Sequence, residues 1–181
     1  MRAIDAGRGG PTRSGLRRGA LKAGALLLAL AMAGTALPAL AGRSPKGIDA
    51  VPPLCLDYAA EEWGVPADAL RLILAVEQGT PGACSANTNG TEDCGPGQIN
   101  TIWFSVIAAG RVPPASIRQA LTNDACYNIR VTAWILRREI DAVGWDRFWT
   151  AVGNYHSRTP ELHAKYLRRI VEAAKALSIQ P

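Results

Sequence analysis

Helical periodicity bounded by prolines and glycines is the feature that most constrains what this chain can fold into. The segment Pro66–Gly79, PADALRLILAVEQG, begins with a proline, which suits a first helical position, and ends with a glycine, which suits the residue just past a helix. Four of its residues share one face at the spacing i, i+3, i+4 and i+7, namely Leu70, Ile73, Leu74 and Glu77. The chain has no strand-like alternation of apolar and polar residues of useful length. The sequence therefore predicts an all-α fold.

Prolines and glycines of the same kind divide the chain after residue 53 into a series of predicted helices, and the sequence contains no internal repeat. The stretch 79–97 is rich in Gly, Asn, Thr and Cys, so we expect a long loop there with a minor β-turn element. Asn123 or Asp124 can cap the longest helix, and Gly144 can close it. The predicted helices are 54–63, 66–78, 98–109, 114–121, 125–143, 146–157 and 160–177.

The positive charge of the chain is confined to its N-terminal part. The formal net charge is +5, and residues 1–41 alone hold six basic residues against Asp5. The basic and acidic residues of the remainder cancel. A protein that binds DNA or RNA needs a concentration of positive charge on its folded body, so this distribution argues against a nucleic-acid partner.

The N-terminal segment has the anatomy of an export signal. A basic stretch ends at Lys22, an apolar stretch follows, and Ala39-Leu40-Ala41 forms a small-x-small cleavage site. We expect cleavage after Ala41, which leaves about 140 residues, a typical size for one domain. The residues 42–53 are rich in Gly, Pro and charge and are expected to be a linker, followed by a single domain over 54–181.

Two features of the export segment leave alternatives open. The apolar run 23–41 is just long enough to span a bilayer, so an uncleaved membrane anchor is the alternative to cleavage. Arg17-Arg18 faintly resembles a twin-arginine signal, although Ala20 stands where a phenylalanine is typical. The export route is therefore open between the general and the twin-arginine pathways.

All four cysteines lie beyond the export segment. An even number of cysteines in an exported chain of this size implies disulfides, and four cysteines allow three pairings. Cys84 and Cys94 bracket a short loop, so a local bridge is the simplest arrangement and leaves Cys55 to pair with Cys126. A zinc site is the weaker alternative, because no C-x-x-C pair is present.

Glu77 is the candidate for chemistry. It lies on the apolar face of the 66–78 helix and at its C-terminal end, and both burial and the negative end of the helix dipole disfavour a charged carboxylate. A carboxyl that stays protonated near neutral pH is what a general acid requires. The alternative is a helix-end glutamate that turns back to solvent.

Two later segments supply polar groups that suit a sugar ligand. In Gly95–Asn100, GPGQIN, a glycine turn exposes the backbone, and Gln98 and Asn100 add amide donors and acceptors. In 151–157, AVGNYHS, Tyr155 can reach a carboxyl across a cleft. Taken singly, the first segment is also compatible with a loop before a helix cap, and Tyr155 with a packing aromatic.

Together and in this order, these segments resemble motifs of the lytic transglycosylases, which have a lysozyme-like catalytic domain. The family's Glu-Ser-x-Gly at the end of a helix is similar to Glu77–Gly79, and its Gly-Leu-Met-Gln-Ile-Asn is similar to Gly95–Asn100. Its Cys-x-Asn-Ile and the following Ala-Trp-Ile-Leu are matched by Cys126–Ile129 and Ala133–Leu136. Its Ala-Tyr-Asn-x-Gly is approximated by Asn154–Ser157.

The resemblance, which covers about 54–167, implies a fold and a reaction. It implies a compact lysozyme-like helical domain with a disulfide-bridged loop after the catalytic helix. Protonated Glu77 would donate to the oxygen between N-acetylmuramic acid and N-acetylglucosamine, and the same residue would later accept the proton of the muramoyl 6-hydroxyl. The product would be a 1,6-anhydro sugar, formed without a metal or cofactor. Tyr155 would hydrogen-bond Glu77 and hold its orientation.

The resemblance also implies partners and a compartment. The partners would be the glycan strands of peptidoglycan, and the compartment would be the periplasm. The closest likeness is to small single-domain members that serve conjugation and related secretion machines, so components of such a complex are expected as further partners.

The sequence departs from the family pattern at four places. Gln78 replaces Ser, Pro96-Gly97 replaces Leu-Met, His156 replaces Asn and Arg158 stands where a Gly is usual. We expect activity to be retained with altered sugar contacts. The residues expected to contact sugar or shape the cleft are Gln78, Gln98, Asn100, Asn128 and His156, with a structural role weighed for Asn128.

Two alternatives to the transglycosylase stay open. An ordinary glycosidase needs a second carboxyl, and Glu92 or Asp93 is the candidate if one of them approaches Glu77. A lysozyme-type hydrolase would then be credible. A noncatalytic module that binds the wall is the other alternative, because Gln78 and His156 depart from the family pattern.

Overall fold

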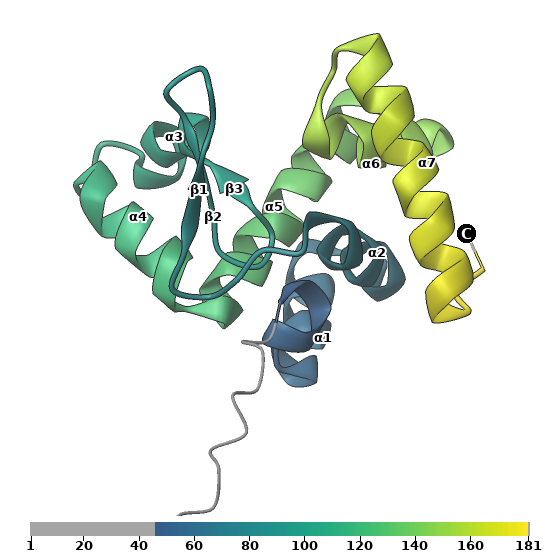
Figure 1. Ribbon diagram of the computed structural model, residues 1–181, viewed down its shortest axis with the longest axis horizontal. Coiled ribbons are helices and arrows are strands. Elements are labelled where there is room, and N and C mark those ends of the chain that lie inside the picture. Colours follow the sequence, from purple (N-terminus) through teal and green to yellow (C-terminus); the bar gives the residue numbers. More distant parts are fainter. Residues whose placement is uncertain (1–45, 181) are drawn as a thin grey trace, which may run out of the picture. The chain divides into compact units, whose positions relative to one another are not determined.

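The computed structural model describes residues 46–180 (Figure 1). The predicted export signal, its cleavage after Ala41 and the alternative of a membrane anchor concern residues 1–41 and lie outside the described part. Within residues 46–180, no helix combines the length and the apolar composition that crossing a membrane requires.

The prediction of an α-rich domain is confirmed for residues 46–180. Helices dominate, three short 3-10 helices join them, and the strands form one small sheet (Figure 1). The α-helices are α1 Pro53–Trp63, α2 Ala67–Glu77, α3 Phe104–Ala108, α4 Pro114–Asn123, α5 Ala125–Val143, α6 Phe148–His156 and α7 Pro160–Leu177. The 3-10 helices are η1 Gly47–Ala50, η2 Thr101–Trp103 and η3 Trp145–Arg147, and the strands are β1 Cys84–Ala86, β2 Glu92–Cys94 and β3 Ile99–Asn100.

Two clusters of buried side chains form the core, and α5 contributes to both. Ile129, Leu136 and Ile140 of α5 pack with the apolar face of α2 in the larger cluster, which also includes residues of α1, α6 and α7. Val131 and Ile135 of α5 pack in the smaller cluster beneath the sheet, α3 and α4. Full burial of one such aliphatic side chain stabilises the fold by about 1.5–3 kcal/mol. The helix α5 therefore joins the two parts of the core.

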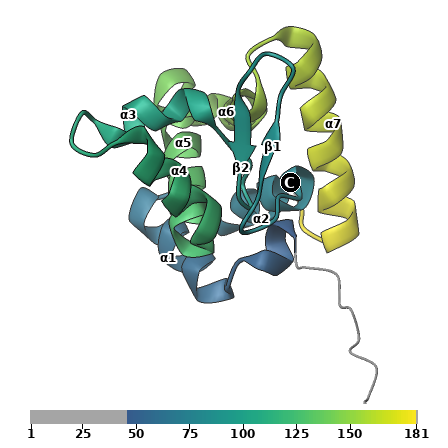
Figure 2. The ribbon, with the colours of Figure 1, turned by 60° about the vertical axis from the view of Figure 1, so that its left-hand side comes forward.

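The loop predicted over 79–97 contains a larger β element than expected. Strands β1 and β2 run antiparallel (Figure 2), with Cys84 opposite Cys94, and β3 extends the sheet beside β2 (Figure 1). The predicted helix over 98–109 is wrong in its first half. Asn100 is extended and caps η2 by accepting a hydrogen bond from the Ile102 amide, and α3 begins only at Phe104. Pairing of Asn100 with Asp93 across the sheet outweighs the helical pattern.

The ends of α2 are fixed differently from the sequence prediction. Pro66 is the N-cap, and Gln78, not Gly79, adopts the left-handed conformation that ends the helix, with φ 55°. Gly79 is needed for another reason, because a Cβ there would lie 1.9 Å from the Gly95 carbonyl oxygen. The turn after Glu77 therefore packs directly against the GPGQIN segment.

The folded region begins before the predicted boundary at residue 54. The expected linker 42–53 includes η1, whose Gly47 amide donates to the Gly79 carbonyl at 2.7 Å. Val51 is buried in the larger core cluster. This segment thus supports the turn that follows Glu77.

Both predicted disulfides are present, and no described cysteine is free. Cys55–Cys126 joins α1 to α5 across a separation of 71 residues, and Cys84–Cys94 joins β1 to β2. In the chain-entropy description, a bridge that closes a loop of this length removes about 4 kcal/mol of unfolded-state freedom.

Of the two residues that the sequence offers as the N-cap of α5, the structure uses Asp124. Its carboxylate accepts a hydrogen bond from the Tyr127 amide at 2.9 Å.

Candidate active site

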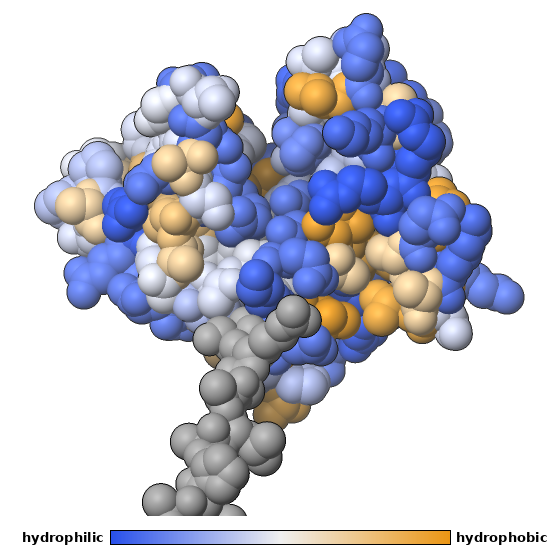
Figure 3. All heavy atoms as spheres, viewed as in Figure 1, coloured by the Kyte–Doolittle hydropathy of each residue, from blue (hydrophilic) through white to orange (hydrophobic). Residues whose placement is uncertain are grey.

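A hollow of about 200 Å³ lies where the end of α2, the sheet, η2, α5 and α6 meet. In Figure 3 the surface is notched between the part formed by α3, α4 and the sheet and the part formed by α6 and α7. Three larger hollows in the described part of the chain, of about 270, 320 and 500 Å³, contain neither Glu77 nor Asp93, so chemistry rather than size selects this one. Its lining residues are Glu77, Asp93, Gln98, Ile99, Asn100, Ile102, Trp103, Ile135, Tyr155 and His156.

Glu77 is the last residue of α2, and its side chain is only 10% exposed. Burial raises its pKa to about 7, and the negative charge of Asp93 adds to that rise. The Tyr166 hydroxyl and the positive charge of Arg169 act in the opposite direction. A carboxyl with a pKa near 7 is present in both protonation states at neutral pH, so Glu77 can donate a proton and later accept one.

Tyr166 on α7 is a neighbour of Glu77 that the sequence did not reveal. Its side chain is fully buried, and its hydroxyl makes no hydrogen bond of normal geometry within residues 46–180. The hydroxyl nevertheless lies close enough to Glu77 to lower the pKa of that carboxyl. Burial and the charge of Glu77 raise the pKa of Tyr166, so it remains a neutral donor. In the sequence, the spacing i, i+4 between Tyr166 and Ile170 marks Tyr166 as a core residue. No residue near Tyr166 in the sequence indicates that its hydroxyl lies beside Glu77.

His156 closes one side of the hollow. Its ring stacks parallel on that of Tyr166 with centroids 4.7 Å apart, and its Nδ1 lies 3.9 Å from Glu77 Oε1. Desolvation, followed by the positive charge of Arg169, lowers the pKa of His156, so the imidazole is neutral near neutral pH. Glu77 therefore has an uncharged ring beside it rather than a cation.

Tyr155 lines the hollow but does not make the hydrogen bond expected from the resemblance. Its hydroxyl donates to the Gly97 carbonyl oxygen at 2.7 Å and lies 3.4 Å from Thr132 Oγ1, not on Glu77. Burial and the nearby charge of Glu77 raise its pKa above the ordinary value. A Cβ on Gly97 would lie 2.1 Å from Thr132 Oγ1, so this close approach requires glycine. Tyr155 positions the GPGQIN segment against α5 and α6.

The amides of Gln98 and Asn100 line the hollow as predicted, but both are already engaged with the sheet. The Gln98 side chain donates to the Gly95 carbonyl at 3.0 Å. The backbone of Gln98 itself is in the left-handed region, with φ 49°. Asn100 donates to Asp93 Oδ1 at 2.7 Å. Each amide nitrogen makes a second hydrogen bond, Gln98 to the Asp93 carbonyl and Asn100 to Thr91 Oγ1, so these side chains have only acceptor capacity left for a ligand in the hollow.

Asn128 and Gln78 are not brought to the hollow. Asn128 is fully buried on α5, accepts from the Gly97 amide, and donates to the carbonyls of Cys94 and Leu121. Its role is to hold the GPGQIN segment, which is the structural alternative weighed from the sequence. Gln78 is exposed, donates to the Ala75 carbonyl at 2.8 Å and lines a different hollow.

Asp93 and Glu92 point to opposite faces of β2, as neighbours on a strand do. Asp93 lines the hollow with Glu77, and its two oxygens accept from Asn100 and Asn87. Glu92 accepts two hydrogen bonds of 2.8 Å from Arg118. Asp93 is therefore the second carboxyl of the site.

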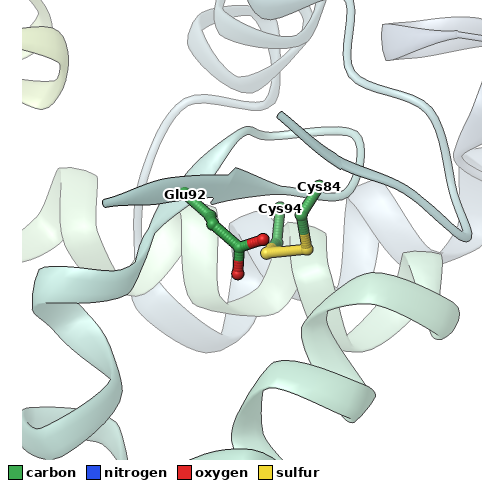
Figure 4. A group of neighbouring side chains, drawn as sticks. All are labelled: Cys84, Glu92 and Cys94. Carbon is green, nitrogen blue, oxygen red and sulfur yellow. A yellow bond between two sulfur atoms is a disulfide. The ribbon is translucent and has the colours of Figure 1, made fainter. Parts of the chain in front are cut away.

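A cluster with potential metal-ligand atoms lies beside the sheet and consists of Cys84, Glu92 and Cys94 (Figure 4). The two sulfurs are joined in a disulfide, and the Glu92 carboxylate is neutralised by Arg118. A disulfide sulfur carries no thiolate charge for a metal, so this group does not form a metal centre.

Comparison with models of known protein families gives no match, and no curated protein is significantly similar to this chain. The chemistry open to the site therefore follows from its own residues. A buried carboxyl with a pKa near 7, a second carboxyl held by two amides and a neutral imidazole converge on one open hollow. This arrangement suits transfer of a proton to and from a bound neutral ligand.

Proposed function

We propose that the chain is a peptidoglycan lytic transglycosylase, which cleaves the β-1,4 bond between N-acetylmuramic acid and N-acetylglucosamine. The observation that carries the proposal is the pKa of Glu77, raised to about 7 by burial inside an open hollow. A single carboxyl that exchanges a proton in both directions is what this reaction needs.

The proposed reaction has two steps. In the first, protonated Glu77 donates to the glycosidic oxygen as the C1–O bond breaks, and the carbonyl oxygen of the muramoyl acetamido group bonds to C1. In the second, the Glu77 carboxylate accepts the proton of the 6-hydroxyl while O6 displaces the acetamido oxygen from C1. The product is a 1,6-anhydromuramoyl end, and Glu77 is protonated again. No water is consumed.

The neighbours of Glu77 support this cycle. The Tyr166 hydroxyl and the Arg169 charge favour the carboxylate, whereas burial favours the acid, so neither form is excluded at neutral pH. Tyr155 and Asn128 hold the GPGQIN segment, and Gln98 and Asn100 offer polar atoms to a sugar. The neutral His156 adds no further positive charge beside the glutamate.

The compartment and the partners belong to the same proposal. Two disulfides are compatible with an exported protein, because such bonds persist in oxidising compartments. We place the protein in the periplasm, acting on glycan strands where a conjugation or secretion apparatus passes through the wall.

A lysozyme-type hydrolase is the second candidate, and Asp93 is the observation that favours it. Asp93 lines the same hollow as Glu77, and its negative charge contributes to the raised pKa of Glu77. Its two oxygens accept hydrogen bonds from the amides of Asn87 and Asn100, which fix the orientation of the carboxyl that a hydrolase would use as its second acidic group.

Digestion of purified sacculi distinguishes the candidates. Wild type, Glu77→Gln and Asp93→Asn would be incubated with sacculi, and the soluble products identified by mass spectrometry. The transglycosylase proposal predicts 1,6-anhydro ends from wild type and from Asp93→Asn, and none from Glu77→Gln. Reducing ends from wild type that disappear in Asp93→Asn would identify the hydrolase. Binding to sacculi without release by wild type and Glu77→Gln alike would identify a noncatalytic module.

A further inference from the structure

A second hollow, of about 500 Å³, lies between α2 and α7 and is lined by Val76 and Gln78, the chain neighbours of Glu77. Its apolar lining includes Val76 of α2 and Ala173 and Ala176 of α7. Figure 3 shows apolar surface between these two helices, bordered by hydrophilic residues. We call this hollow the α2–α7 groove.

The α2–α7 groove carries uncompensated positive charge. Lys165, Arg168 and Arg169 line it from one stripe of α7, at the helical spacing i, i+3 and i+4. None of the three has a carboxylate within ion-pair distance in the part of the chain that the structure describes. Glu172, which also lines the groove, is paired with Lys175 at 2.9 Å.

Elsewhere in residues 46–180, most arginines are matched with carboxylates. The paired arginines are Arg71, Arg118, Arg130, Arg137 and Arg158. Against that background, three neighbouring cations without a carboxylate mark the α2–α7 groove as complementary to an anionic ligand.

The groove and the candidate active site meet at the end of α2. Arg169 donates to the Val76 carbonyl oxygen at 2.5 Å, and its charge lowers the pKa of both Glu77 and His156. The charge of Lys165 acts on His156 in the same direction. One cation of the groove, Arg169, therefore acts on Glu77, and a second, Lys165, acts on the neighbouring His156.

We propose that the α2–α7 groove binds the stem peptide of peptidoglycan through its carboxylates. The inference rests on the proposed function. In that substrate the peptide is attached to the lactyl group of the muramoyl unit. The glycosidic bond of this unit, which is the bond that is cleaved, must lie at Glu77. The groove is lined by Val76 and Gln78, the chain neighbours of Glu77, so a peptide that extends from this unit toward α7 would lie in it.

The chemistry of the stem peptide matches both surfaces of the groove. Its glutamate and its diamino acid carry free carboxylates, which Lys165 and Arg168 can bind, and its alanines can pack on Ala173 and Ala176. The substrate class is therefore peptide-bearing glycan, in preference to glycan without peptides. Loss of two exposed charged contacts is expected to weaken binding about fivefold to tenfold, which corresponds to about 1.0–1.4 kcal/mol in total.

The test compares two glycan probes, strands that keep their peptides and the same strands stripped of peptides by an amidase. The variant is Lys165→Ala with Arg168→Ala, which leaves Arg169 on the Val76 carbonyl. The matched control is Arg111→Ala with Arg147→Ala, which removes the same charge from residues outside the groove. Binding is measured by calorimetry in a Glu77→Gln background, and KM is measured with active protein.

We expect the parent protein to bind peptide-bearing strands roughly fivefold to tenfold more tightly than stripped strands, and added salt to reduce the difference. The groove variant loses this preference, and the control variant keeps it. Equal affinity of the parent for both probes would overturn the inference, as would equal weakening of both by the groove variant. Competition by oligoglutamate as strong as that by free stem peptide would also overturn it, because the groove would then bind any acidic chain.

These outcomes are separate from those of the proposed function. Binding to Glu77→Gln needs no turnover, so the peptide preference can be present even if wild type cleaves neither probe. Conversely, cleavage of both probes at equal KM would support the enzyme while removing the groove from its substrate recognition.

Discussion

Glu77 and Glu139 are both glutamates buried in helices, and they differ in what lies beside them. Their side chains are 10% and 6% exposed. Arg158 binds both oxygens of Glu139 at 2.9 Å. The histidine beside Glu77 is 3.9 Å away and has a lowered pKa. One buried carboxyl thus has a guanidinium that compensates its charge, and the other has a neutral ring.

Burial alone therefore does not make a carboxyl a reactive acid. A buried carboxylate is tolerated when a cation pairs with it, and it is driven to the protonated form when none does. Glu139 therefore acts as a structural link between α5 and the segment before α7, whereas Glu77 has a pKa of about 7 and faces an open hollow. The same substitution at the two positions should have opposite consequences.

The largest expected effect is on turnover. Glu77→Gln should lower the rate of release from sacculi by about a thousandfold, because a general acid contributes roughly 10²–10⁴. Glu139→Gln should leave the rate within about twofold of wild type, since Glu139 does not line the hollow. The measurement is the initial rate of muropeptide release by both variants. Similar losses of rate in the two variants would contradict the claim that Glu77, and not Glu139, acts in catalysis.

The next effect is on stability and its pH dependence. The raised pKa of Glu77 means that the folded state keeps a proton that the unfolded state loses between pH 4.5 and about 7. Stability therefore falls as the pH rises through this window, by about 3 kcal/mol for the full shift. Glu77→Gln should match wild type near pH 4.5 and exceed its free energy of unfolding at pH 8. Urea unfolding at the two pH values measures the difference, and a constant offset would contradict it.

A smaller effect, of opposite sign, is expected at the paired glutamate. Glu139→Gln should lower the free energy of unfolding at pH 7 by about 1–2 kcal/mol, because a charge-assisted hydrogen bond is weakened. Arg158 is 68% exposed and can turn to water, which keeps the cost below that of a fully buried pair. Urea unfolding of this variant provides the measurement. A gain in stability would show that Arg158 does not compensate the buried charge.

The smallest effect concerns the tuning of Glu77. Tyr166→Phe removes the hydroxyl that lowers the Glu77 pKa, so the alkaline limb of the kcat/KM profile should move to higher pH. The pH profiles of wild type and Tyr166→Phe measure the shift. A limb that stays in place, or moves to lower pH, would remove Tyr166 from the site.

Much of the fold and part of the site could be predicted from local pattern. The spacing of Leu70, Ile73 and Glu77 gives one apolar helix face, and the structure buries that face. The loop between Cys84 and Cys94 is short enough to suggest its own bridge, which the structure contains. These features depend on residues that are close together in the sequence, so local sequence patterns are enough to predict them.

The rest depends on contacts between distant segments. Tyr166 approaches Glu77 because α7 packs on α2, and the periodicity of α7 alone marks Tyr166 only as core. Asp93 faces the hollow and Glu92 does not, because both lie in strand β2, where successive side chains point to opposite faces. The sequence predicts a loop at these residues and so does not predict which carboxyl faces the hollow. The Tyr155 hydroxyl donates to Gly97 because a glycine lets that backbone come close, a geometry with no local signature.

The most direct test of the account is an NMR titration of the Glu77 carboxyl carbon in the folded protein, assigned by comparison with Glu77→Gln. We expect an apparent pKa of about 7, well above the ordinary value of 4.5 for a glutamate side chain. Titration near 4.5 would show a solvated carboxylate at position 77 and would contradict the assignment of Glu77 as the proton donor.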